Sequence, residues 1–220
     1  IMSGIVGGIN LRSSGLVNNS SAADGQLLTG TGLGLPAGFE AAAGGAAGLT
    51  KIDSTTITGA VAVAFDEDDI TSDYSHYLIV GEGVGVASDN DVMGVQGSVD
   101  NGSSFPTHVF MNLWGGPHSN SAPSTAWEGN LAYLQLAGGI EADVGGGGTS
   151  FTVEIFNTTS TAEYKYMMYE SFDKNANSYW YKHTGGGMIQ STTALNYVKV
   201  YNVTGNNLDS GKVTLYGVAP

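Results

Sequence analysis

Hydrophobic and polar positions alternate along much of the chain after residue 56, which is the pattern of half-buried β-strands. In the clearest case, Phe151, Val153 and Ile155 share one face of a strand, with Thr152 and Glu154 on the other. No window has the 3.6-residue period of an amphipathic helix. The alternating segments are rich in residues that favour strands, and they cover 57–65, 74–80, 92–99, 105–113, 131–136, 151–156, 164–169, 178–182, 197–203 and 212–218.

Turn signals separate these segments. Asn101-Gly102 lies between two of them, and Asn-Gly is the strongest short hairpin signal. Glycine runs at 145–148 and 185–187 also predict turns. We interpret the Gly-rich run 81–85 as a β-turn, because the helix that a dinucleotide-binding loop requires does not follow it. About ten short strands at this spacing predict an all-β fold, an antiparallel β-sandwich of jelly-roll type over residues 51–220.

The first 50 residues differ in composition from the rest of the chain. They contain 12 Gly, 8 Ala and only three charged residues. Glycine at this density disfavours a helix, and the short apolar clusters are too small to close a core. We therefore expect residues 1–50 to form an extended Gly/Ala-rich N-terminal arm that adds to the sheet edge of a neighbouring subunit. The assembly residues in this hypothesis are Ile5, Val6, Ile9, Leu11, Leu16 and Val17.

The charge balance excludes several classes of protein. Twenty acidic residues against seven basic ones give a net charge of −13, which repels nucleic acid. The absence of cysteine excludes a disulfide framework and a thiolate nucleophile. No segment approaches the roughly 20 apolar residues of a membrane span, and no secretory signal is visible. Residues 53–163 contain 15 acidic residues and no Lys or Arg. This acidic part of the chain could pair with the basic C-terminal third of another copy of the chain. Alternatively, it forms a solvated surface that keeps the protein soluble.

The sequence contains no strong catalytic or metal-binding motif. His76, His108, His118 and His183 lack partners at metal-ligand spacing, so we expect them to be structural or exposed. A nucleophile elbow, a zinc-protease motif and a phosphate-binding loop are all absent. We therefore predict a protein that is not an enzyme, with no catalytic residue, no cofactor and no metal.

Two acidic features are weaker candidates. Glu154 and Glu170 could face each other as a glycosidase pair, which needs two carboxylates about 5–10 Å apart. Acids on the solvated face of a strand are far commoner, and we favour that interpretation. The run Asp66 to Asp69, followed by Asp73, suits a cation with oxygen ligands, but its spacing matches no known calcium loop. A solvated loop is the simpler interpretation.

An aromatic-rich hairpin is the last candidate feature. A flat aromatic platform can stack on sugar rings, which suggests a carbohydrate-binding module. Tyrosine and tryptophan are also enriched in cores and interfaces, and we favour that explanation. The residues concerned are Tyr164, Tyr166, Tyr169, Tyr179, Trp180 and Tyr181.

Four segments resemble a module found in tailed-phage structural proteins. Residues 72–105, SDYSHYLIVGEGVGVASDNDVMGVQGSVDNGSSF, are similar to its Y-x-x-Y strand and DGGSSF-like hairpin. Residues 198–220, VKVYNVTGNNLDSGKVTLYGVAP, are similar to its closing SGN-x-x-SGT-x-x-LYG signature, although Lys212 stands in place of Thr. Residues 151–171, FTVEIFNTTSTAEYKYMMYES, also fit. Residues 23–40, ADGQLLTGTGLGLPAGFE, are similar to the DGQVLTSDGTG segments of phage fibre and virion proteins.

This resemblance implies a structural role in a virion, as a capsid decoration, fibre or tail-associated protein, and it implies no catalytic residues. Together with the strand pattern, it predicts a non-enzymatic, self-assembling structural protein of a phage-type virion or fibre, located in the virion or outside the cell. Copies of the chain are the expected partners, with other virion proteins and a surface glycan as further candidates. The alternatives are a subunit of an extracellular helical filament and a carbohydrate-binding β-sandwich module.

Overall fold

The computed structural model describes residues 26–29, 38–41, 48–115, 124–142, 148–177 and 179–218. The chain divides into two compact units, residues 1–45 and 46–220, which we describe separately. In the first unit, β1 (Gln26–Thr29) pairs with β2 (Gly38–Ala41) as an antiparallel two-stranded ribbon. The second unit contains twelve strands, and the described residues contain no helix.

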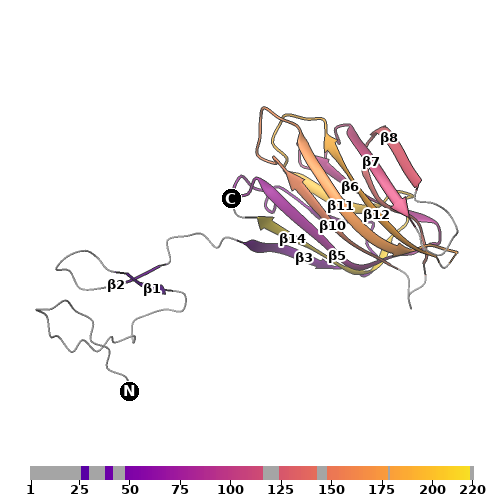
Figure 1. The fold of residues 1–220 in the computed structure, drawn as a ribbon, viewed down its shortest axis with the longest axis horizontal. Coiled ribbons are helices and arrows are strands. Elements are labelled where there is room, and N and C mark those ends of the chain that lie inside the picture. The colour runs from indigo at the N-terminus through magenta and orange to yellow at the C-terminus, as the bar shows by residue number, and fades with distance from the viewer. Residues whose placement is uncertain are drawn as a thin grey trace, which may run out of the picture. The chain divides into compact units, whose positions relative to one another are not determined.

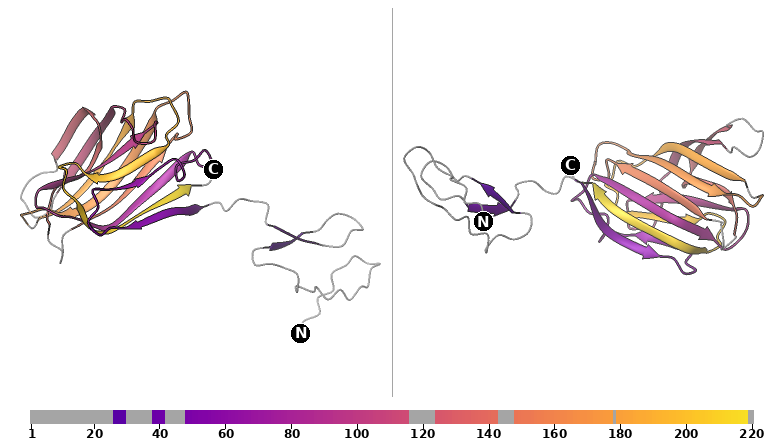
Figure 2. Two further views of the ribbon diagram at one scale, coloured as in Figure 1. Left: turned by 180° about the vertical axis from the view of Figure 1, so that it is seen from behind. Right: turned by 60° about the horizontal axis from the view of Figure 1, so that its bottom comes forward.

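The second unit is built from two antiparallel sheets that lie face to face (Figures 1 and 2). The larger sheet has eight strands, in the spatial order β3 (Leu49–Thr56), β14 (Leu208–Val218), β5 (His76–Val86), β10 (Thr149–Phe156), β11 (Lys165–Lys174), β12 (Trp180–Ile189), β7 (His108–Gly115) and β8 (Ser124–Leu131). The smaller sheet has the order β4 (Ala62–Phe65), β13 (Tyr197–Asn202), β6 (Asp91–Ser98) and β9 (Leu134–Ile140). The prediction of an all-β, two-layer antiparallel fold is confirmed.

The hydrophobic core lies between the two sheets. Along β10 and β11 buried and exposed positions alternate, and Phe151, Val153 and Ile155 face inward as the sequence predicts. The largest fully buried apolar side chains are Tyr77, Phe65, Ile79, Met93, Leu134, Leu136, Ile140, Ile155, Met167, Ile189 and Leu208. Each such side chain contributes about 1.5–3 kcal/mol to folding. The alternation leaves the opposite face of β10 and β11 open to solvent.

The Asn101-Gly102 turn connects the two sheets, so the prediction of a hairpin at this position is wrong. Both residues have positive φ, 54° and 79°, as a tight turn of this type requires. The strands on either side do not pair, because β6 belongs to the smaller sheet and β7 to the larger one. Hydrogen bonds from Ser104 and Ser98 stabilise the turn, and they lower the pKa of Asp100 to about 2.

Two glycine runs that predicted turns lie inside strands instead. Residues 185–187 belong to β12, and residues 81–85 belong to β5. A Cβ on Gly185 would lie 2.4 Å from the carbonyl oxygen of Met111, so glycine permits close approach of the neighbouring strand. In β5 the pairing with β10 and with β14 shifts register near Gly83, which has a φ of 56°. This run is therefore an irregular strand segment with β-bulges. The glycines at 145–147 lie outside the described residues.

Candidate functional site on the outer face of the larger sheet

The face of the larger sheet that points away from the core carries most of the exposed large apolar side chains. Its cross-strand rows follow from the register of the pairs, because residues directly opposite each other share a face. In one row Met168 of β11 lies opposite Gly186 of β12, which lies opposite Met111 of β7. In the next row Tyr166 and Met188 are opposite each other. The outer face therefore presents side chains from several distant parts of the sequence.

An apolar patch covers one part of this face. It consists of six outward-facing residues on three adjacent strands, and we call it the Met patch: Val109, Met111, Leu113, Tyr166, Met168 and Met188. Met111 is 62% exposed and Met168 is 60% exposed, so these long side chains lie largely in water. Gly186 stands between them in the row and adds no side chain. The six positions are apolar, and Glu154 of β10 borders them as the direct cross-strand neighbour of Met168. The Met patch is therefore suited to contact with another apolar surface that has a polar rim.

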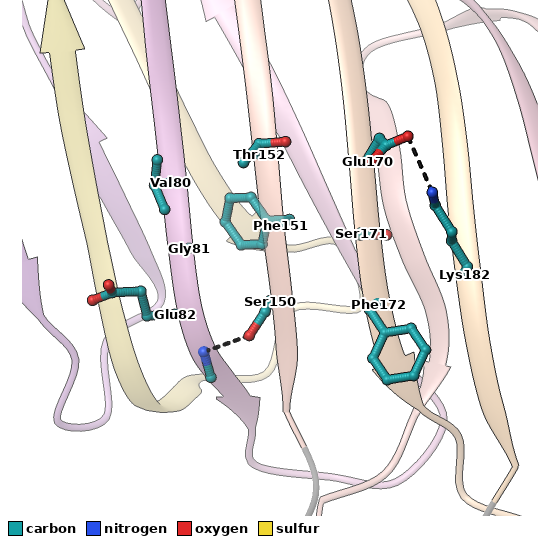
Figure 3. Close-up of a pocket in the computed structure, with 11 residues that line it drawn as sticks. Val80, Gly81, Glu82, Ser150, Phe151, Thr152, Glu170, Ser171, Phe172 and Lys182 are labelled. Carbon is teal, nitrogen blue, oxygen red and sulfur yellow. Dashed lines mark hydrogen bonds and ion pairs between the residues drawn. The ribbon is translucent and has the colours of Figure 1, made fainter. Parts of the chain in front are cut away.

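A shallow depression of about 460 Å³ lies on another part of the same face, across β5, β10, β11 and β12 (Figure 3). Polar groups and one exposed aromatic ring surround it. Its lining residues are Val80, Gly81, Glu82, Gly83, Ser150, Phe151, Thr152, Glu170, Ser171, Phe172 and Lys182. The backbone N–H of Gly83 donates to Ser150 Oγ at 3.1 Å, and Lys182 Nζ donates to Glu170 Oε1 at 3.2 Å. The depression therefore combines hydrogen-bonding groups of both kinds with an apolar surface.

Phe172, which lines the depression, forms a pair of parallel aromatic rings with Trp180, which lies beyond the lining residues. Their ring centroids are 5.5 Å apart and their planes differ by only 10°. Phe172 is 50% exposed and Trp180 is 40% exposed. Trp180 comes from the aromatic-rich hairpin that the sequence singles out, whereas its partner Phe172 was missed.

The aromatic-rich hairpin does not form a single platform. Its strands pair as β11 and β12, with Lys174 opposite Trp180. Tyr164 and Tyr166 are exposed, but Tyr169 points into the core and is only 3% exposed. Burial raises the pKa of the Tyr169 hydroxyl above its ordinary value. Alternation along the strand therefore divides the aromatic residues between the two faces of the sheet.

Glu154 and Glu170 stand on this same outer face, and not on opposite sides of a cleft. Glu154 is paired with Met168 in the ladder and Glu170 with Thr152, so the two acids are diagonal neighbours on adjacent strands. Each has its own basic contact. Glu154 Oε2 lies 3.4 Å from His76 Nε2, and Glu170 Oε1 lies 3.2 Å from Lys182 Nζ. This arrangement lacks the facing geometry of a glycosidase pair.

A buried polar cluster that the sequence analysis missed lies between the sheets. His183 Nε2 is 2.9 Å from Asp173 Oδ1, and Ser171 is the direct cross-strand neighbour of His183. The three residue types are those of a hydrolytic triad, but the Ser171 hydroxyl donates to the carbonyl oxygen of Leu136 at 2.5 Å. All three residues are buried. Because a nucleophile must reach its substrate, this geometry favours a structural link between β11 and β9.

The other histidines occupy different environments. His76 stacks on Phe156, with 4.4 Å between ring centroids. His108 is buried and accepts a hydrogen bond from the backbone N–H of Gly97 at 3.1 Å. His118 lies outside the described residues.

The acidic run at 66–69 forms a turn after β4. The backbone N–H groups of Asp69 and Ile70 both donate to the carbonyl oxygen of Asp66. Across the ranges that the structure describes, no group of three or more His, Asp or Glu residues is placed to hold a metal ion. We therefore assign no cation site to this run.

The six residues predicted to mediate assembly through the N-terminal arm lie outside the described residues. Comparisons of the chain with known protein families, with curated proteins and with solved structures found no match. The part of the chain that the structure describes has no helix long and apolar enough to cross a membrane.

Proposed function

We propose that this chain is a non-enzymatic, self-assembling structural protein of a phage-type virion or fibre. In this proposal residues 51–220 form a sandwich of jelly-roll type, and residues 1–50 form an extended arm that links subunits. The resemblance of residues 72–105 and 198–220 to tailed-phage structural proteins supports the virion role. The connectivity is compatible with a jelly roll, because most consecutive strands from β3 to β14 lie in different sheets. The exceptions are the connections β7–β8, β10–β11 and β11–β12, which join neighbouring strands of the larger sheet.

The single observation that carries self-assembly is the Met patch. Soluble monomers rarely expose contiguous apolar surfaces of large side chains unless a partner covers them. A second copy of the chain is a suitable partner, because an apolar contact places no like charges directly against each other, and its burial offsets the repulsion between two chains of net charge −13. An extracellular helical filament would use the same contact. Electron micrographs of the assembled particle distinguish a virion appendage from a free filament.

Charged substitutions in the Met patch test this proposal. In the double variant Met111→Glu, Met168→Glu, carboxylates replace two largely exposed apolar side chains and break any apolar contact. Position 168 lies opposite Glu154, so circular dichroism checks that the variant folds. Light scattering should give an assembled wild type and a double variant of clearly lower assembled mass, because only the contact through the arm remains. Val61→Glu is the matched control, because Val61 is 64% exposed and lies outside the larger sheet. A double variant that assembles like the wild type would contradict the proposal.

A further inference from the structure

We propose that the depression across β5, β10, β11 and β12 binds a neutral glycan, with Phe172 and Trp180 as the platform for a sugar ring. This proposal is independent of self-assembly, because it concerns a different part of the outer face and a different partner.

The aromatic pair has the geometry that a sugar ring requires. A pyranose has faces rich in C–H groups, which pack on the electron-rich face of an aromatic ring. In Figure 3 the ring of Phe172 turns its face toward the viewer, beside Lys182. Because the plane of Trp180 differs from that of Phe172 by only 10°, both rings present a face in nearly the same direction. With 5.5 Å between the centroids, the rings are stacked with an offset, so one ring supports the other and the outer ring offers its free face to a sugar.

Hydrogen-bonding groups adjoin this platform, as sugar hydroxyl groups require. Glu170 supplies acceptors and Lys182 supplies donors, and both side chains are more than half exposed. Exposed ion pairs of this kind contribute only about 0–1 kcal/mol, so they exchange partners at little cost. Ser150 Oγ accepts from the backbone N–H of Gly83, which leaves its own O–H free to donate. Thr152 adds a further hydroxyl group at an exposed position.

The size and charge of the depression favour a short neutral sugar segment. Its volume of about 460 Å³ lies within the range of about 300–1,000 Å³ that is typical of small-ligand sites. Gly83 leaves one position of β5 open, because a Cβ there would meet no atom within 4 Å, whereas the space beside Gly81 is filled by the ring of Phe151. Two carboxylates line the depression, and each is in an ion pair, Glu82 with Lys212 and Glu170 with Lys182. These pairs leave the depression without unpaired charge, and the net charge of −13 on the chain disfavours acidic glycans.

A second copy of the chain is the competing occupant. The Met patch, which we assign to self-assembly, contains no charged residue, whereas the depression contains two carboxylates and an ammonium group. Burying those groups against another subunit carries a desolvation cost that a hydroxyl-rich sugar would offset with hydrogen bonds. The observations therefore favour the glycan.

Calorimetric titration of the full chain tests the proposal. The probes are chitotriose, cellotriose, maltotriose and a mannotriose, with sialyllactose as the acidic comparison. We expect measurable binding of at least one neutral probe and weaker or no binding of sialyllactose. Binding of none of the neutral probes, or of sialyllactose alone, overturns the proposal.

Variants locate the site. Phe172→Ala and Trp180→Ala should each weaken binding about tenfold or more, the scale of one lost stacking contact. Tyr164→Ala is the matched control, because Tyr164 is an aromatic residue with 42% exposure that precedes β11, whereas Phe172 lies near the other end of that strand. Unchanged affinity in both platform variants overturns the assignment.

Light scattering on the same variants separates this proposal from self-assembly. If Phe172→Ala and Trp180→Ala reduce the assembled mass and leave sugar affinity unchanged, the platform is a subunit contact and the glycan site is wrong. If they abolish sugar binding and leave the mass unchanged, the glycan site stands whether or not the Met patch mediates assembly.

Discussion

His108 joins the two sheets through hydrogen bonds that only a neutral imidazole can make. Its Nδ1–H donates to the carbonyl oxygen of Pro106 at 2.7 Å, and its Nε2 accepts from the backbone N–H of Gly97 at 3.1 Å. Gly97 belongs to β6 of the smaller sheet, whereas His108 begins β7 of the larger sheet. Protonation of Nε2 would remove the acceptor, and burial lowers the pKa of His108 to about 4.

This lowered pKa predicts a loss of stability in acid. Between the ordinary value of 6.5 and about 4, the unfolded chain binds a proton at His108 that the folded chain does not. Stability should therefore fall as the pH decreases through this range, by on the order of 1 kcal/mol per pH unit from this residue. Urea unfolding from pH 7.5 to pH 4 measures the slope. His108→Gln should be less stable at pH 7.5 but should show a shallower slope. An unchanged slope would exclude His108 as its source.

Asp91 stabilises the region where β6 begins and the β13–β14 turn packs against it. Its buried carboxylate accepts hydrogen bonds from Asn202 Nδ2 at 2.6 Å, from Asn206 Nδ2 at 2.9 Å and from the Thr204 hydroxyl. Burial alone would raise the pKa of Asp91, but these hydrogen bonds outweigh it and hold the pKa below its ordinary value. The network needs the ionised carboxylate.

Asp91→Ala should destabilise the fold by about 2–4 kcal/mol, because it leaves several buried donors without an acceptor. Thermal and urea unfolding at neutral pH measure the loss. Asp68→Ala is the matched control, since the Asp68 side chain is exposed and should change stability little. Equal stability of the two variants would mean that water replaces the Asp91 carboxylate.

At the scale of strands, the sequence pattern indicated the central strands of the larger sheet and missed both of its edges. β10 and β11 alternate sharply because one face is buried along their whole length. β3 and β8 were not predicted, and they are the two edge strands. An edge strand has one neighbour and is partly exposed, so little apolar alternation is required. In β3 the charged residues Lys51 and Asp53 further mask the pattern while protecting the edge from unwanted pairing.

Glycines inside β12 could not be placed from sequence, because close approach between strands depends on register. A Cβ on Gly187 would lie 2.4 Å from the carbonyl oxygen of Val109 and 2.8 Å from Phe110 Cβ. Gly187→Ala should therefore destabilise the chain by about 1–3 kcal/mol, the cost of overpacking. Gly48→Ala, with no atom within 4 Å of the added carbon, should be nearly neutral in the same urea unfolding measurement. Similar losses in both variants would contradict steric overlap as the cause, because the backbone entropy of the unfolded chain favours alanine at either position.

At the scale of the whole molecule, the candidate site depends on which strands pair in the larger sheet and in which register, and the composition of the chain does not predict either. The aromatic segment was visible in the sequence, but the partner of Trp180 was not, because Phe172 meets it through the register of β11 with β12. The Met patch likewise joins residues of the consecutive strands β11 and β12 to residues of β7, which lies much earlier in the chain. Conversely, the net charge of −13 and the absence of cysteine were available from the sequence alone.

The N-terminal arm provides the last prediction, which concerns assembly of the whole chain. The unit from Ala46 to Pro220 is compact by itself and retains all twelve strands of the two sheets. A chain that begins at Ala46 keeps β3, which pairs with β14 from Leu49 opposite Val218, so it should fold. It should assemble less than the full chain, because each large apolar residue of the arm contributes about 1.5–3 kcal/mol when a neighbouring subunit buries it.

Circular dichroism and light scattering at one protein concentration measure folding and assembly of the truncated chain. A full-length variant with Ile5→Ser, Ile9→Ser and Leu16→Ser separates the loss of these side chains from the loss of chain length. Because an arm that pairs with the next copy makes a head-to-tail contact, its removal should abolish rings or filaments, as seen in electron micrographs, and leave monomers or small complexes held by the Met patch. If the truncated chain assembles like the full chain, the arm is only a linker, and the Met patch alone accounts for self-assembly.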